Sequence, residues 1–376
     1  MLDSNASQTP TRKLIEPSLT EVLGIVFASY AVFMVVLHFL GGSYWWLADG
    51  HSGDTPAYLQ AAAAIRHWQF SGVDAKQFWG LPYAMASVSV LTGISETWAL
   101  IVVCVGTSIV SLALCYWLWD GWIALFFALL SLDWLQRSLL GGAEPLFVAL
   151  VLGSFLALRK GKWEYAAILG ALATVVRPFG VFALVGLGIE LLYRKKFWEC
   201  AIATITALMI GALYVWPLQH YLGNPFANIA AYQHRDWRGG LPVNLPFVAI
   251  FHDTIPINAP WTNLLLTGGW IVFVLVGILV AVRTGELRRY ASTHTAEAGF
   301  VVLFCVALYT YDAPGWSRSN FPRFAVPILP WILAFLEPYL PKQRPLIWGL
   351  AVITPTLAAA SAIGIRQTAG VLRHLI

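Results

Sequence analysis

The chain has 376 residues, of which 59% are hydrophobic and 11% are charged, and its formal net charge is +4. Ordinary soluble proteins carry about 25% charged residues, so a mean hydropathy of +0.70 excludes a soluble globular protein and indicates a chain solvated largely by lipid. The few positive charges fall in short gaps between apolar runs, where they set membrane orientation, which argues against a nucleic-acid-binding surface.

The first apolar run, residues 22–40, follows a polar leader that contains Arg12 and Lys13. It is long enough to cross a bilayer and no small-residue cleavage site follows it, which predicts a signal anchor with its N-terminus inside.

Apolar runs recur to the end of the chain and predict an all-α, polytopic transmembrane bundle of about 11–12 spans or half-spans in a single domain, residues 1–376. Residues 81–93 are too short for a full span, so we expect a half-span or re-entrant helix there. The predicted spans are residues 22–40, 97–118, 121–137, 144–158, 164–176, 178–193, 198–217, 261–282, 296–311, 323–340 and 346–365.

Four positive clusters separate these runs, and the positive-inside rule predicts that all of them face the cytoplasm. They lie at residues 159–162, 194–196, 283–289 and 342–344. The longer gaps then face outward and are expected to carry short helices: residues 41–80, residues 218–260, and a shorter one at residues 312–322.

The first outer loop contains Asp54 and Thr55 directly before Pro56 and an alanine-rich run. This pattern favours a helix that begins at the proline, with Asp54 or Thr55 as its cap. The alternative is that Asp54 is a general base at the membrane surface. His51 lies three residues earlier and is either a second polar group of that site or a solvated loop residue.

Glu144 opens a predicted span from the outer side, where a helix dipole favours an acidic residue. Arg177 precedes Pro178 between two short apolar runs, so we expect a helix break there. A charge at that depth costs about 2.5–3.5 kcal/mol on insertion scales, and Arg177 should therefore have an anionic partner, a carboxylate or a phosphate. The predicted topology brings Asp54, Glu144 and Arg177 to the same side of the membrane.

The large outer loop mixes aromatic, amide and charged side chains, and either sugar binding or interfacial anchoring would account for them. Its candidate substrate-binding residues are Gln233, His234 and Trp237. Arg318 and Arg323 stand at the outer end of a later span, where each would either bind a phosphate or extend to lipid headgroups.

Five features taken together resemble the GT-C glycosyltransferases, multi-spanning enzymes whose donors are sugars linked to polyprenyl phosphate. The likeness is greatest to the mannosyltransferase-type and arabinosyltransferase-like members. The features are Gly53-Asp54 before Tyr58, the span start at 144–147, Arg177-Pro178, residues 223–226 leading to Gln233 and Trp237, and Arg323-Phe324 before Pro327 and Pro330. The chain departs from many relatives in having one acid rather than two at residue 54, an Asn-Pro pair at residues 224–225, and no large C-terminal soluble domain.

The resemblance implies an inverting transfer from a polyprenyl-phosphate sugar to an acceptor hydroxyl of a lipid, a glycan or a protein. Asp54 would act as the general base and Glu144 would orient the acceptor or support Asp54. Arg177, Arg323 and Arg318 would bind the donor phosphate, and Tyr58, His51, Gln233, His234 and Trp237 the substrates. No cofactor is implied, and a divalent metal is not favoured.

Three other functions fit the same apolar pattern: a secondary transporter, a ligase that transfers whole glycans, and a non-catalytic lipid-binding protein. A transporter would place charges or unwound segments near the bilayer midplane and would show inverted repeats. We expect an integral membrane protein in a bacterial inner membrane, surrounded by membrane lipids, with its active site on the periplasmic side.

Overall fold

The structure is a computed structural model that describes residues 16–235, 243–248, 261–311 and 321–364. Within these ranges every regular element is a helix, and the only extended pairing is a single bridge between Val243 and Tyr311. The all-α prediction is therefore confirmed for the described part of the chain.

Four helices are long and apolar enough to cross a bilayer, which supports an integral membrane protein. Between 20 and 26 residues long, they match the length that a hydrocarbon core requires. The third of them exposes Leu208, Met209 and Leu213 instead of burying them, as expected of a surface that lipid covers. These helices are α1 (Leu19–Phe39), α5 (Glu96–Leu118), α11 (Phe197–Leu222) and α19 (Arg344–Ile363).

Two further runs are bent pairs of helices, so the described residues contain up to six spans if each pair crosses once. In the first pair α6 (Gly121–Leu130) meets α7 (Leu132–Leu140) at 80°. The second pair joins α14 (Trp261–Arg283) to α15 (Glu286–Thr293) at 78°.

The straight span predicted at residues 121–137 is wrong. Ser131 ends α6 and its hydroxyl accepts a hydrogen bond from the Trp134 amide, which caps α7 in a new direction. A polar cap in the middle of an apolar run therefore turns the chain into the protein interior.

The other predicted spans correspond to shorter helices, and the predicted outer loop at 41–80 carries short helices. The expected half-span is α4, which has 13 residues. The run at 323–340 is a chain of four short helical pieces. The shorter elements are α2 (Tyr44–Trp46), η1 (Leu47–His51), α3 (Thr55–His67), α4 (Gly80–Thr92), α8 (Glu144–Arg159), α9 (Trp163–Val176), η2 (Pro178–Gly180), α10 (Val181–Tyr193), α12 (Ala227–Arg235), α16 (Thr295–Thr310), α17 (Phe321–Ala325), η3 (Val326–Ile328), α18 (Leu329–Phe335) and η4 (Glu337–Tyr339).

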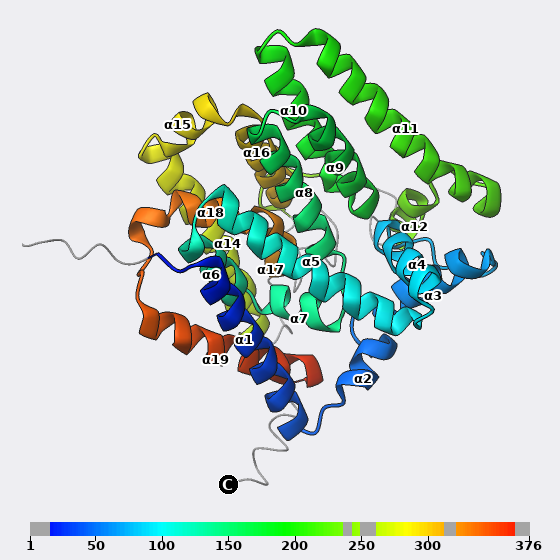
Figure 1. Ribbon diagram of the computed structural model, residues 1–376, viewed down its shortest axis with the longest axis horizontal. Coiled ribbons are helices and arrows are strands. Elements are labelled where there is room, and N and C mark those ends of the chain that lie inside the picture. The colour runs from blue at the N-terminus through cyan, green and yellow to red at the C-terminus, as the bar shows by residue number, and fades with distance from the viewer. Residues whose placement is uncertain (1–15, 236–242, 249–260, 312–320, 365–376) are drawn as a thin grey trace, which may run out of the picture.

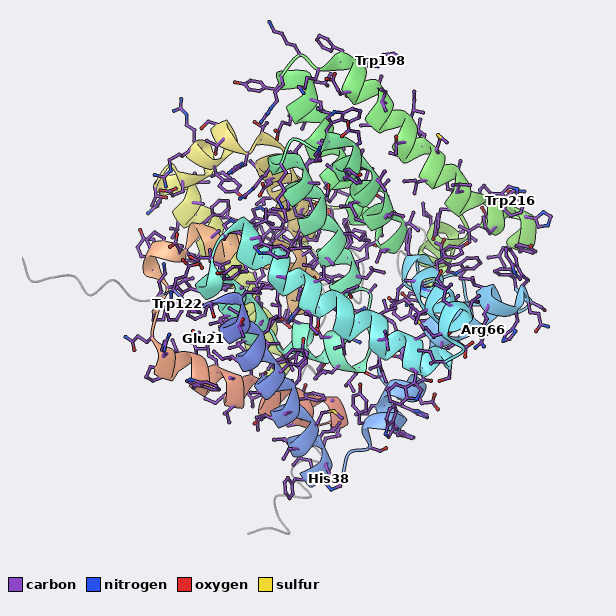
Figure 2. All side chains as sticks on the ribbon, in the orientation of Figure 1. Glu21, His38, Arg66, Trp122, Trp198 and Trp216 are labelled. Carbon is purple, nitrogen blue, oxygen red and sulfur yellow. The ribbon has the colours of Figure 1, made fainter. Side chains whose placement is uncertain are left out.

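Figure 1 shows α1 and α19 together along the lower left edge and α11 along the upper right edge, with α7, α8 and α17 between them. Figure 2 shows Trp198 and Trp216 toward opposite ends of α11, and Glu21 and His38 at opposite ends of α1. Tryptophan near both ends of an apolar helix is typical of the two membrane interfaces.

Small residues bring the interior helices into close contact. A β-carbon added at Gly186 in α10 would lie 2.2 Å from the Ala296 carbonyl oxygen in α16. Such close backbone approach is how helices associate in a bilayer, where apolar burial alone gives little preference. The interior between the helices is filled by large side chains such as Trp134, Phe147 and Trp331.

Candidate active site

A cluster of charged side chains is built from four segments that are far apart in the sequence. Asp54 directly precedes α3, Glu144 is the first residue of α8, Arg177 lies between α9 and η2, and Arg323 lies in α17. Ion pairs join all four side chains. The predicted convergence of Asp54, Glu144 and Arg177 is therefore found, and Arg323 completes it.

Glu144 stands at the centre of this cluster and is fully buried. Its Oε1 atom accepts hydrogen bonds from both Arg177 and Arg323, while its Oε2 atom is buried without a hydrogen-bond partner. A carboxylate with no solvent exposure is out of reach of a ligand that enters from outside. Its geometric effect is to fix two guanidinium groups side by side.

Asp54 pairs with Arg323 across 2.7 Å between Oδ2 and Nη1. Asp54 is the N-cap residue of α3, as predicted, but its side chain makes no capping hydrogen bond to that helix. The stronger attraction is the guanidinium of Arg323, which also reaches Glu144. The Asp54 side chain keeps 31% of its surface exposed, so of the two carboxylates it is the one that a ligand can reach.

The charge of Arg323 also determines the acidity of Asp54. Burial by itself raises the pKa of the Asp54 carboxyl, but the Arg323 charge and hydrogen bond, with help from Arg137, outweigh it and hold that pKa below its ordinary value of 3.8. Asp54 is therefore ionised at neutral pH and is a weak base while Arg323 is bound to it.

Arg323 is buried, with 6% of its surface exposed, so the alternative that it extends to lipid headgroups is wrong. Its guanidinium joins Asp54 to Glu144 and lies 5.8 Å from the centre of the Phe324 ring. The Arg177 guanidinium lies 5.4 Å from the same ring. Phe324 thus supports both cations from one side.

Arg177 owes its position to the proline that follows it. Pro178 disfavours helical geometry at the preceding residue, and Arg177 is extended, with φ −148° and ψ 137°. The break ends α9 at Val176 and directs the Arg177 side chain toward Glu144. Its expected anionic partner is therefore a carboxylate of this chain, and its Nε atom is buried without a hydrogen-bond partner.

The loop before α3 is fixed to the end of α7. The Thr55 hydroxyl donates to the Leu140 carbonyl over 3.3 Å, and the Tyr44 hydroxyl donates to the Leu139 carbonyl over 2.7 Å. The last carbonyls of a helix have no partner within it, so these side chains satisfy them. Asp54 is held beside α7 as a result.

The attachment of this loop to α7 places Asp54 near Arg137, which was not among the predicted site residues. Arg137 lies in α7, and a β-carbon added at Gly53 would lie 2.7 Å from its Nη1 atom. The signal was present, because a charged residue in the apolar run 121–140 is a functional candidate by default. A straight span ending at residue 137 would place Arg137 at the membrane surface, whereas the 80° bend between α6 and α7 brings it to the cluster.

Tyr58 lies one turn into α3 and is buried. Burial, with a smaller effect of the Asp54 charge, raises the pKa of its hydroxyl above its ordinary value of 10.0. Tyr58 is therefore a neutral wall residue of the cluster. His51 is exposed and stacks on Trp46, with 4.1 Å between ring centres, and within the described residues no hydrogen bond or ion pair joins it to Asp54.

The remaining predicted site residues are only partly covered. Gln233 and His234 lie in α12, and Trp237 and Arg318 fall outside the described residues. α12 is attached to the first outer loop through buried Asn228, whose amide nitrogen donates to the Ala75 and Gln77 carbonyls over 2.5 and 2.8 Å. The two predicted outer loops therefore adjoin each other.

A second ion pair, in which Glu297 is buried and Arg159 is half-buried, lies away from this cluster at the other end of α8. Arg159 pairs with Glu297 over 2.6 Å and also reaches the Tyr290 hydroxyl and the Leu118 carbonyl. Arg159, the first residue of the positive cluster at 159–162, thus also joins helices through its ion pair with Glu297. A cavity of about 210 Å³ adjoins this pair, and Glu190 also lines it.

No family model matches the chain, and neither a curated protein nor a solved structure matches it significantly. Within the described ranges there is also no group of three or more His, Cys, Asp or Glu side chains placed to hold a metal ion. The expectation of no metal remains a prediction.

In chemical terms, the cluster combines an accessible carboxylate with three guanidinium groups behind it. Ion pairs join Arg177 and Arg323 to Asp54 and Glu144, and Arg137 lies beside them with Asp133 on the same helix. Such an arrangement suits a reaction in which a proton is removed from one group while negative charge develops on another.

Proposed function

We propose that this protein is a membrane glycosyltransferase that moves a sugar from a polyprenyl-phosphate donor to an acceptor hydroxyl, with inversion at the anomeric carbon. The observation that carries the proposal is the ion pair of Asp54 and Arg323 beside Glu144 and Arg177. A base and phosphate-binding cations are the two parts that this chemistry needs, and here they are in contact.

The reaction is a single displacement. The acceptor oxygen attacks the anomeric carbon as its proton passes to the Asp54 carboxylate, and the bond between that carbon and the phosphate oxygen breaks. The polyprenyl monophosphate leaves with the electron pair. Arg323 and Arg177 stabilise the negative charge that develops on the phosphate, since a guanidinium binds phosphate oxygens in a bidentate manner.

Arg323 couples donor binding to the basicity of Asp54. In the resting cluster it lowers the basicity of Asp54. A donor phosphate competes for the same guanidinium, so donor binding weakens the Asp54 contact and makes the carboxylate a better base. Glu144 is fully buried and holds both arginines in place, so we assign it a positioning role in place of contact with the acceptor.

The same proposal assigns a location and substrates. Positive-inside orientation puts the Asp54 loop on the extracytoplasmic side, which we propose to be the periplasmic face of a bacterial inner membrane. The acceptor is a hydroxyl of a lipid, a glycan or a protein. Tyr58 borders the site, and α12, with Gln233 and His234, adjoins the first outer loop through Asn228.

The test is sugar transfer from radiolabelled polyprenyl-phosphate sugars to a membrane acceptor pool by the purified protein. We expect Asp54→Asn to lower the transfer rate by about 10²–10⁴-fold, the usual contribution of a general base. Asp49→Asn is the matched control, because Asp49 is an exposed aspartate of the same loop whose carboxylate accepts a hydrogen bond from Thr97. Equal transfer by wild type and Asp54→Asn would refute the role of Asp54.

A wild-type protein that transfers none of the common lipid-linked sugars would refute the glycosyltransferase proposal. Counterflow of labelled substrate in proteoliposomes would then test the transporter alternative.

A further inference from the structure

Arg137 differs from the other two arginines of the cluster in having no carboxylate partner. It makes no ion pair or hydrogen bond within the described part of the chain, and its Nε atom is buried. A guanidinium does not lose its proton in a protein, so it keeps a full positive charge there. Arg137 is half-buried, and a partly desolvated charge without a directly bonded counter-ion favours the binding of an anion.

The geometry places this unpaired charge at the candidate active site. The Nη1 atom of Arg137 occupies the space beside Gly53, the residue before Asp54, and Gly53 has a φ of +53°. A β-carbon added at Gly142 would lie 2.6 Å from both the Arg137 Cδ atom and the Glu144 Oε2 atom. Two glycines thus leave the room that the Arg137 side chain fills.

Glu144, Asp133 and Asp54 act on the Arg137 charge from a distance, but within the described residues none of them forms an ion pair with it. Asp54 is paired with Arg323, and the bonded oxygen of Glu144 is shared by Arg177 and Arg323. Asp133 lies one helical turn earlier in α7, and no ion pair joins it to Arg137 within the described residues. An incoming anion can therefore bind Arg137 without breaking any ion pair that is already formed.

We infer that Arg137 makes the first contact with a phosphate monoester at this site, before that phosphate competes for Arg323, which Asp54 and Glu144 hold beside it. The inference rests on the proposed function only in taking that phosphate to be the head of a lipid-linked donor. The planar guanidinium offers two parallel N–H groups to two phosphate oxygens.

The test is direct binding to the full chain in phosphatidylcholine nanodiscs, followed by tryptophan fluorescence. The probes are farnesyl phosphate, farnesol and inorganic phosphate, so the lipid part and the phosphate part are measured separately. We expect wild type to bind farnesyl phosphate more tightly than farnesol. Arg137→Gln should weaken farnesyl phosphate binding about tenfold or more, because it removes charge-assisted hydrogen bonds, and should leave farnesol binding unchanged.

Two further variants separate the role of the guanidinium from a loss of folding. Gly53→Ala keeps every charge but adds a methyl group where Nη1 lies, and we expect it to weaken farnesyl phosphate binding in the same direction. Arg288→Gln removes one positive charge from an exposed position in α15 and should bind like wild type.

Each outcome decides the inference. Equal binding of farnesyl phosphate by wild type and Arg137→Gln overturns it, as does a wild type that binds neither phosphate probe. Equal dependence on Arg137 for inorganic phosphate and farnesyl phosphate supports a phosphate site in which the lipid tail plays no part. Asp54→Asn should keep binding while losing transfer, so a protein that binds through Arg137 but transfers no sugar refutes the proposed function and leaves this inference standing.

Discussion

Neutralising Glu144 is the sharpest test of how the cluster is held together. Glu144→Gln keeps the size of the side chain and one carbonyl oxygen as an acceptor, and it removes only the negative charge. Glu144 is fully buried and its Oε1 atom accepts from both Arg177 and Arg323. In the variant Arg177 has no carboxylate within reach in the described structure, while Arg323 keeps Asp54.

Removing one partner of a buried ion pair costs about 3–5 kcal/mol, because the remaining charge is left without a counter-ion. Since Arg323 retains Asp54 and the glutamine still accepts a hydrogen bond, we expect the lower end, about 3 kcal/mol of unfolding free energy. The assay is equilibrium unfolding in mixed micelles with increasing SDS, followed by circular dichroism. Glu286→Gln is the control, because its partner Arg289 is 76% exposed, and an exposed pair contributes about 0–1 kcal/mol.

The double variant with Arg177→Gln checks the cause. If an unpaired guanidinium is the source of the loss, removing it should make the double variant more stable than Glu144→Gln alone. A Glu144→Gln protein that unfolds like Glu286→Gln would refute the reasoning, since it would mean that the buried charges contribute no net stability.

Two further predictions follow from the geometry. Gly186→Ala places a methyl group against the Ala296 carbonyl and should lower the free energy of unfolding by about 1–3 kcal/mol. Gly188→Ala, on the same helix, adds a methyl group in open space and should leave stability unchanged. Thermal unfolding compares the two variants, and equal melting temperatures would show that α10 and α16 are not in close contact. Arg323 lowers the pKa of Asp54 in the folded state below its ordinary value of 3.8. The stability that this ion pair contributes is therefore fully present at pH values above 3.8, and it is lost as the pH falls through the pKa of Asp54 in the folded protein. The stability difference between wild type and Asp54→Asn should therefore be constant across about pH 5–8 and shrink only in stronger acid, and a difference that already falls at pH 6 would contradict the lowered pKa.

Composition and local pattern determined the class of the fold. A chain with 11% charged residues cannot cover a soluble core, and long apolar runs at residues 22–40 and 97–118 became α1 and α5. Pro178 likewise predicted the break at Arg177, because proline restricts the backbone of its neighbour regardless of the surroundings. These features depend on hydropathy and backbone chemistry within a few residues.

The partners of the charged side chains could be predicted only in part. Because intramembrane charges require counter-ions, the sequence indicated that Arg177 had an anionic partner and that Asp54 and Glu144 lay on its side of the membrane. Which carboxylate pairs with which arginine depends on contacts between residues more than a hundred positions apart, such as Glu144 with Arg323. No local pattern encodes that pairing.

Tertiary structure alone decided the rest of the site. The 80° bend at Ser131 turns α7 inward and brings Arg137 to Gly53, whereas the sequence reads as one continuous apolar run. The same folding draws the Asp54 carboxylate away from its helix to Arg323, because in a site shielded from water a full opposite charge attracts it more strongly than backbone N–H groups do. Hydropathy thus determined that this chain enters a membrane, and the pairing of charges shielded from water determined where its polar centre lies.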